Sequence, residues 1–256
     1  WSRLLELSGG SEGYLRMVRL EDADVSGPFT EIPADVHAQA ELDCMCYTSA
    51  LEQIAERYHA APELLEQLNP GRALDSLAAG DSLLVPGVDS FELADAVADS
   101  LGPQPAGAVD RIVVSADGFY LHALDAEGRL LHHFPTTLGS RYQPSPSGAF
   151  RVASITFDPW FHWQPALFDE VPDSEPDERI PPGPNSPVGI VWIALTKENY
   201  GIHGTSEPAT IGYATSHGCV RLTNWDARLL AESVRPDVPV VFRDLEGEGP
   251  IAAARR

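Results

Sequence analysis

The second half of the chain carries a series of short apolar segments, rich in β-branched and aromatic residues and bounded by turn residues. They are residues 111–114, 119–124, 130–135, 150–156, 188–195 and 238–242. This length and composition are typical of strands. One helix is expected near the end, at residues 226–234, with Leu229 and Leu230 facing inward and Thr223 or Asn224 as N-cap. The pattern predicts a β-rich domain with few helices.

The first half is organised differently. Ser49 and Glu52 have the spacing of a capping box, and an apolar face follows at Leu51, Ile54, Ala55 and Tyr58, which predicts a short amphipathic helix. A second helix is expected from Pro62 to the stop signal at residues 69–71, and a strand at residues 82–85. Residues 1–40 sustain no period and are left unassigned. A Pro/Gly-rich stretch at residues 102–107 indicates a linker and a boundary near residue 108.

An irregular insertion, residues 158–189, interrupts the strand pattern. It contains several prolines, an acidic run at residues 169–178 and the aromatic residues Trp160, Phe161, Trp163 and Phe168. A loop of this length inside a compact domain is usually functional or disordered. We interpret it as a lid or groove wall, with Trp160 and Trp163 as candidate substrate contacts; the alternative is a surface excursion stiffened by proline.

The charge balance argues against two classes of partner. The chain has 17 Lys plus Arg against 38 Asp plus Glu, a formal net charge of -21. Such a protein repels polyanions, so neither nucleic acid nor an anionic membrane surface is an expected partner. No run approaches the roughly 18 apolar residues of a membrane helix, so no transmembrane segment is expected in this chain. The chain does not open on a signal peptide, so an export signal is expected to have been removed or never present.

Three cysteines are too few for a disulfide framework. Cys44 and Cys46 lie two positions apart, so a bridge between them would close a very small ring, and a metal site would need a second pair. We expect both to be unpaired thiols. Cys219 stands apart from them in the sequence.

The sequence around Cys219 has the features of a reactive thiol. The chain reads Ile-His-Gly-Thr at residues 202–205 and Ser-His-Gly-Cys-Val-Arg-Leu at residues 216–222. A thiol becomes a nucleophile at neutral pH when an imidazole takes its proton or an imidazolium stabilises the thiolate, and His203 or His217 could do either. Gly218 permits a tight turn, and Arg221 could hold a carboxylate.

Two other interpretations of Cys219 remain open on spacing alone. It could be a buried structural thiol within a strand. It could also join His203 and His217 in a soft metal site, which would need a further ligand and a supporting carboxylate.

The same residues, with Pro-Pro-Gly-Pro-Asn-Ser-Pro-Val-Gly at 181–189, resemble the L,D-transpeptidases of the YkuD (ErfK/YbiS) family. That pattern is a His-Gly followed, after a spacer, by Ser/Thr-His-Gly-Cys and commonly Arg. Residues 138–140 and 144–150 resemble the family's glycine turn and Thr-Pro-Xaa-Gly segment, with Ser145 in place of Thr. The resemblance covers residues 109–243 and implies a mixed β-sandwich with few helices.

The resemblance implies a role for each matching residue. Cys219 would be the nucleophile and His203 its activating base, with backbone contacts from Gly204 holding the imidazole. His217 and Gly218 would line the oxyanion hole with Cys219, and Ser216 and Arg221 would shape the pocket. Neither a metal nor a cofactor is implied.

The implied reaction is acyl transfer on peptidoglycan. Cys219 would attack the diamino acid of a tetrapeptide stem and expel D-alanine, and the acyl group would pass to an amine, forming a cross-link or anchoring an envelope protein. Water as acceptor would make the chain an L,D-carboxypeptidase. The resemblance also implies roles in cell-wall biogenesis and cell shape, a periplasmic or exported location, and acylation by carbapenems. The alternatives are a non-catalytic peptidoglycan-binding protein and a thiol hydrolase of another amide.

Residues 42–87 resemble a LysM module, a small α+β peptidoglycan-binding unit. The matching stretches are residues 54–58, 64–71 and 79–86, whereas residues 48–51 replace the usual Gly-Asp-Thr-Leu turn. The alternative is a helical spacer that binds nothing. The expected organisation is an unassigned segment 1–41, a LysM-like module 42–87, a linker 88–108, a catalytic domain 109–244 with the insertion 158–189, and a tail 245–256.

Overall fold

The computed structural model describes residues 14–88, 90–91, 109–115, 118–140, 144–167, 172, 174–213, 215–216 and 218–243. The chain divides into two compact units, and the division does not follow the sequence order. The first unit contains the described residues up to 32 and those of 46–95, and the second contains residues 33–45 and the described residues after 96. Each unit is described by itself.

The first unit is built on two strands that lie far apart in the sequence. β1 (Leu15–Arg19) pairs antiparallel with β2 (Ser82–Pro86), so the segment left unassigned from the sequence contributes a strand. Four short helices join them: α2 (Asp22–Val25), α4 (Ala50–Arg57), α5 (Pro62–Leu68) and the 3-10 turn η1 (Leu74–Ser76). Their shared core includes Ile54, Leu65, Leu83 and Val85.

The two predicted helices of this unit are confirmed. α4 begins after Ser49, whose hydroxyl accepts the N–H of Glu52 at 3.2 Å. The Glu52 carboxylate accepts the N–H of Thr48 instead of completing the capping box at Ser49. The α4 face carrying Ile54 and Ala55 is buried, as the periodicity predicts.

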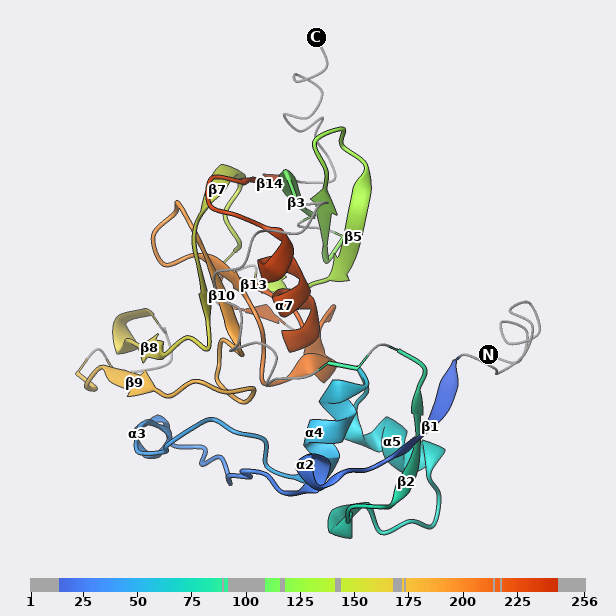
Figure 1. Cartoon of the computed structure of the whole chain (residues 1–256). Helices are drawn as coiled ribbons and strands as arrows, with labels where there is room; N and C mark the ends of the chain where they lie inside the picture. The colour runs from blue at the N-terminus through green and yellow to red at the C-terminus, as the bar shows by residue number, and fades with distance from the viewer. Residues whose placement is uncertain are drawn as a thin grey trace. The chain divides into compact units, whose positions relative to one another are not determined.

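The second unit is built around one eight-stranded mixed sheet (Figure 1). Its strand order is β13, β11, β10, β7, β14, β3, β4, β5. The bounds are β3 (Arg111–Ser115), β4 (Tyr120–Leu124), β5 (Leu130–Pro135), β7 (Gly148–Phe157), β10 (Val191–Leu195), β11 (Gly201–His203), β13 (Val220–Arg221) and β14 (Pro239–Arg243). The six predicted strands are all present, and the β-rich fold with few helices is confirmed.

Two smaller strand pairs complete this unit. β6 (Leu138–Gly139) runs parallel to β12 (Thr215–Ser216). β8 (Phe161–Trp163) pairs antiparallel with β9 (Glu178–Ile180) inside the insertion, which is therefore more ordered than the irregular loop predicted from its composition. Short 3-10 turns lie at η2 (Pro165–Leu167) and η3 (Pro208–Thr210).

The segment of residues 33–45 belongs to this second unit although the first unit lies on both sides of it in the sequence. Its helix α3 (Val36–Ala40) packs on β9, where His37 Nδ1 lies 2.8 Å from a carboxylate oxygen of Glu178. Met45 is fully buried; its N–H donates to the carbonyl of Pro182, and its own carbonyl accepts from Asn185 N–H, both at 2.9 Å. These contacts attach the segment to the insertion and to the loop before β10.

The C-terminal helix α7 (Asn224–Ser233) packs on β10 and β11. Thr223 is its N-cap, since the threonine hydroxyl accepts the N–H of Asp226 at 3.3 Å. Leu230 is fully buried as predicted, but the prediction for Leu229 is wrong, because its side chain is 42% exposed. Ala227 and Ala231, one turn apart from each other, share the buried face with Leu230, and Leu229 lies beside that face.

The prediction of unpaired thiols at Cys44 and Cys46 is also wrong. Both are disulfide-bonded, and Cys219 is the free cysteine, so the two pair with each other. The small ring that argued against this bridge is accommodated around Met45, the residue between them.

Several predictions lie outside the described residues: most of the linker 88–108, the tail 245–256, and His217. In the described part of the chain, the helices are all too short or too polar to cross a bilayer.

Candidate active site

Strand register brings the candidate base and Arg221 to one face of the sheet. β11 and β13 are parallel neighbours, with Ile202 opposite Val220 and His203 opposite Arg221. Side chains alternate along a strand, so His203 and Arg221 face away from the side on which Ile202 and Val220 are buried. Cys219 directly precedes β13, and the charge of Arg221 acts on both the Cys219 thiol and the His203 imidazole.

The imidazole of His203 is held in one orientation. Its ring is 4% exposed and stacks on the Trp192 indole, with centroids 5.3 Å apart. Nδ1 lies 2.6 Å from the carbonyl oxygen of Gly204. A carbonyl only accepts, so Nδ1 carries the hydrogen and Nε2 keeps its lone pair. Burial, together with the positive charge of Arg221, lowers the pKa of His203 to about 3, so the ring is neutral at neutral pH.

Cys219 is half-buried and carries its proton in the resting state. Burial raises the pKa of its thiol, although a backbone hydrogen bond from Gly201 and the charge of Arg221 act in the opposite direction. The Sγ atom lies 3.8 Å from the carbonyl of Asn199, which accepts its hydrogen. The site therefore holds a neutral thiol and a neutral imidazole, not a thiolate and an imidazolium.

The turn before Cys219 is braced by two serine hydroxyls. Ser216 Oγ donates to the carbonyl of Cys219 at 2.6 Å and accepts the N–H of Gly218 at 3.1 Å. Ser145 Oγ donates to the carbonyl of Gly218 at 2.8 Å and accepts the N–H of Gly139 at 2.9 Å. Gly218 has φ +114°, and a Cβ there would lie 2.9 Å from the Tyr200 ring, so the turn requires glycine.

Arg221 presents an unused donor on the same face. Its backbone pairs with Thr137 through two hydrogen bonds of 2.8 and 3.0 Å. Its Nε is buried and has no hydrogen-bond partner among the described residues. Burial lowers the pKa of the guanidinium, while Glu207 and Cys219 raise it. A buried cationic donor without a partner can receive an anionic group.

The two tryptophans predicted to contact substrate lie in the insertion: Trp163 ends β8, and Trp160 directly precedes that strand. Trp160 is 53% exposed, and the guanidinium of Arg179 lies 4.9 Å above its ring. Trp163 is buried and meets the His37 ring edge-on at 5.9 Å. Trp160 is thus the more accessible of the two.

Within the described residues, no group of three or more His, Cys, Asp or Glu side chains is placed to hold a metal ion. His217 lies outside the described residues, so this statement does not cover it.

Sequence reasoning missed several residues that support the site. Trp192 stacks on the His203 ring, Asn199 accepts from the Cys219 thiol, and Asn224 is fully buried behind the His203–Gly204 segment. Asn224 was considered only as a helix cap, and the cap is Thr223. These contacts join segments that are distant in sequence, so no local signal identifies them.

Comparison with known proteins assigns this chain to a family. Residues 109–242 match the family model described as the L,D-transpeptidase catalytic domain, YkuD. This chain belongs to the YkuD family. The family is one of enzymes, as the motif predicts.

Two relatives cover most of the chain. The putative L,D-transpeptidase YkuD of Bacillus licheniformis is 29% identical over 72% of this chain and 87% of its own length. The Bacillus subtilis protein of the same description is 28% identical over the same shares. An L,D-transpeptidase structure from Mycobacterium smegmatis aligns with 66% of this chain and 76% of its own, at 16% identity and a TM-score of 0.44.

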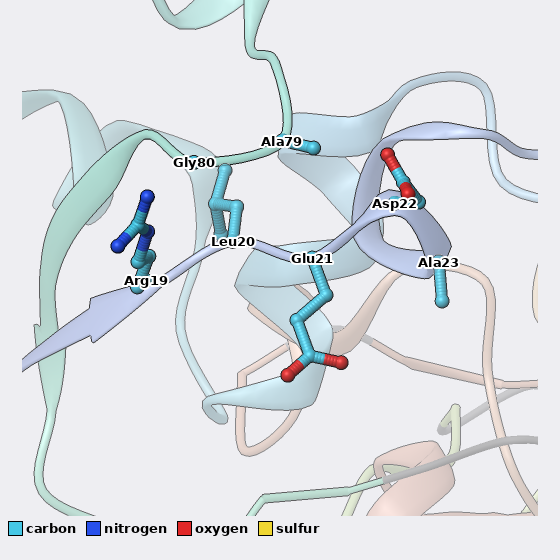
Figure 2. A pocket seen from close by; sticks show the side chains of 7 residues that line it. All are labelled: Arg19, Leu20, Glu21, Asp22, Ala23, Ala79 and Gly80. Carbon is cyan, nitrogen blue, oxygen red and sulfur yellow. The ribbon is translucent and has the colours of Figure 1, made fainter.

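The first unit has a shallow hollow of its own. Figure 2 shows it where the end of β1 meets the loop before β2. It is lined by Arg19, Leu20, Glu21, Asp22, Ala23, Ala79 and Gly80. The lining combines three charged side chains with four small or apolar residues.

Proposed function

We propose that this YkuD-family chain is a peptidoglycan L,D-transpeptidase with Cys219 as nucleophile and His203 as general base. The observation that carries the proposal is the neutral imidazole, fixed at Nδ1 by Gly204, on the strand that pairs with β13, which the free thiol directly precedes. A base whose Nε2 lone pair is held ready is what a neutral thiol needs.

In the first half-reaction, Sγ attacks the carbonyl of the stem's diamino acid. The thiol proton passes to Nε2 of His203 as the carbon–sulfur bond forms, and the imidazolium then protonates the departing amine of D-alanine. A thioester on Cys219 remains. In the second half-reaction an acceptor amine attacks the thioester and gives its proton to His203, and that proton returns to the thiolate.

The oxyanion of each tetrahedral intermediate is assigned to backbone N–H groups at residues 217–219. The Gly218 N–H donates to Ser216 Oγ over 3.1 Å in the free protein. An oxyanion competes well for this donor, because charge-assisted hydrogen bonds are roughly twice as strong as neutral ones. Such donors typically contribute about 3 kcal/mol each to acyl transfer.

Arg221 is proposed to bind a carboxylate of the stem peptide. Its buried Nε has no partner among the described residues, and its positive charge acts on the Cys219 thiol. Stem peptides that end in D-alanine carry such a carboxylate. Trp160, exposed in the insertion, is proposed as a further substrate contact.

The first unit is proposed to hold glycan as a LysM-like module. Two antiparallel strands and two helices around one core support this, and the hollow in Figure 2 offers polar groups to a sugar. Local glycan binding raises the effective concentration of stem peptides at the thiol. This function places the protein in the cell envelope, where the Cys44–Cys46 disulfide would persist.

The test is product analysis on a disaccharide-tetrapeptide. Wild-type protein is expected to release D-alanine and form either a cross-linked dimer or a tripeptide, which separates an amine acceptor from water. Adding an amine-bearing envelope protein tests the third acceptor. Cys219→Ala should release nothing. Release by Cys219→Ala, or none by folded wild type, would refute the proposal and favour a wall-binding protein.

A further inference from the structure

Asn224 is a fully buried polar side chain near the site for which the mechanism has no role. It begins α7, but the cap of that helix is Thr223. Its Oδ1 accepts the N–H of Ile190 at 3.3 Å, and its Nδ2 donates to the carbonyl of Pro184 at 3.2 Å. The carboxamide thus ties the loop before β10 to the start of α7.

The same oxygen fills a gap between two glycines. A Cβ on Gly204 would lie 2.1 Å from Asn224 Oδ1, and one on Gly189 would lie 2.0 Å from it. Both residues therefore leave room for the carboxamide, and the Gly204 backbone rests against it. The carbonyl of Gly204 is the group that accepts from His203 Nδ1 at 2.6 Å.

We propose that Asn224 is a positioning residue for the base: its carboxamide fixes Gly204, and Gly204 fixes the orientation and tautomer of the His203 imidazole. The inference rests on the proposed function, because it concerns the base of that reaction. Without the carboxamide, the Gly204 carbonyl can turn, and the proton can move from Nδ1 to Nε2. A ring protonated at Nε2 cannot accept the thiol proton there.

The experiment compares Asn224→Ala with Thr223→Ala, its matched control. Thr223→Ala removes the cap of the same helix but leaves the carboxamide and Gly204 untouched. We expect Asn224→Ala to lower kcat for D-alanine release by about 10- to 100-fold, as a misplacement of about 1 Å can. KM should change by less than about twofold, because substrate binding is not the step affected. Thr223→Ala should keep kcat near the wild-type value.

A spectroscopic readout separates positioning from a loss of stability. In 15N-histidine-labelled protein, the His203 signals are identified by their absence in His203→Gln. We expect wild type to show the Nδ1–H tautomer and Asn224→Ala to show a larger share of Nε2–H. An unchanged tautomer, together with a kcat equal to that of Thr223→Ala, would overturn the inference.

A second pair of variants tests the same contact from the Gly204 side and refills the space that Asn224→Ala leaves. Gly204→Ala alone places a methyl group against Asn224 Oδ1, whereas Gly204→Ala with Asn224→Ala places it in the space that the carboxamide leaves. We expect the double variant to exceed Gly204→Ala in kcat by about tenfold, a non-additivity typical of residues in contact. Equal kcat values in the two folded variants would overturn the inference. Cys219→Ala, run alongside, shows whether the proposed reaction itself has failed.

Discussion

The two units of this protein differ in whether their buried polar groups have hydrogen-bond or ion-pair partners. In the first unit they are paired: the Tyr47 hydroxyl donates to Glu56 at 2.6 Å, and Arg57 forms an ion pair with Asp24. At the candidate active site of the second unit, the Arg221 Nε has no partner among the described residues, and the Cys219 thiol lies a long 3.8 Å from the carbonyl that accepts its hydrogen. Paired groups stabilise a fold, whereas unpaired ones are left for a substrate.

The largest effect on activity is expected from replacing His203, the proposed base. His203→Gln is expected to lower kcat/KM for D-alanine release by about 10²- to 10⁴-fold, the usual contribution of a positioned general base. Steady-state assays of D-alanine release measure this. His122→Gln, a change at a cross-strand histidine pair on β4 and β5, is the control and should retain activity. Equal losses in both variants would mean that His203 has no special role.

The next effect is a dependence of the free energy of unfolding on pH. The folded pKa of His203, about 3, lies below its unfolded value of 6.5, so the unfolded state binds the proton first as pH falls. The stability that the neutral ring contributes is therefore present above pH 6.5 and is lost toward pH 3. Between pH 7 and pH 4, wild type should lose roughly 3 kcal/mol more free energy of unfolding than His203→Gln.

Urea unfolding of both proteins at the two pH values measures this difference. Asp226, whose pKa burial raises to about 6, acts with the opposite sign, but it is common to both proteins and cancels. Parallel losses in the two proteins would show that the His203 ring is not held neutral.

A smaller effect is expected at Arg221. Arg221→Gln should raise KM for the tetrapeptide by roughly 10- to 100-fold, since hydrogen bonds to charged groups contribute about 1.5–3 kcal/mol. Its free energy of unfolding should not fall, because the Nε has no partner to lose among the described residues. Arg243→Gln, which removes an equal charge at the Tyr120 hydroxyl, is the control. If Arg221→Gln were less stable and its KM unchanged, Arg221 would serve the stability of the fold and not substrate binding.

The smallest effect lies in the first unit. Tyr47→Phe removes the donor to Glu56 and should cost about 1–2 kcal/mol of stability without changing the acylation rate of Cys219. Tyr58→Phe, in the same core, should cost less, because its ring and not its hydroxyl contacts Arg16. Chemical denaturation and acylation assays on both variants decide this. A lower acylation rate in Tyr47→Phe would contradict the assignment of this pair to stability alone.

Local chemistry explains what the sequence could predict. The caps at Ser49 and Thr223 begin their helices as expected, and short β-branched runs such as residues 111–114 became strands. The motif at residues 216–222 made Cys219 the candidate nucleophile because it sets a thiol beside histidine and arginine, which can activate it.

Contacts between distant segments explain what the sequence could not predict. β1 pairs with a strand whose residues lie far along the chain, so Leu15 and Pro86 show no shared local signal. The direction of the Cys219 and His203 pKa shifts depends on burial, which spacing does not reveal. The disulfide at Cys44 and Cys46 forms where Met45 docks on Pro182, again a long-range contact.

The most direct test of the account is intact-mass spectrometry of wild type and Cys219→Ala after incubation with a carbapenem. Cys44 and Cys46 are bridged, so Cys219 is the free thiol that can react. The account predicts one adduct of the carbapenem's mass on wild type and none on Cys219→Ala. An adduct on both proteins, or on neither while wild type is folded, would contradict Cys219 as the nucleophile.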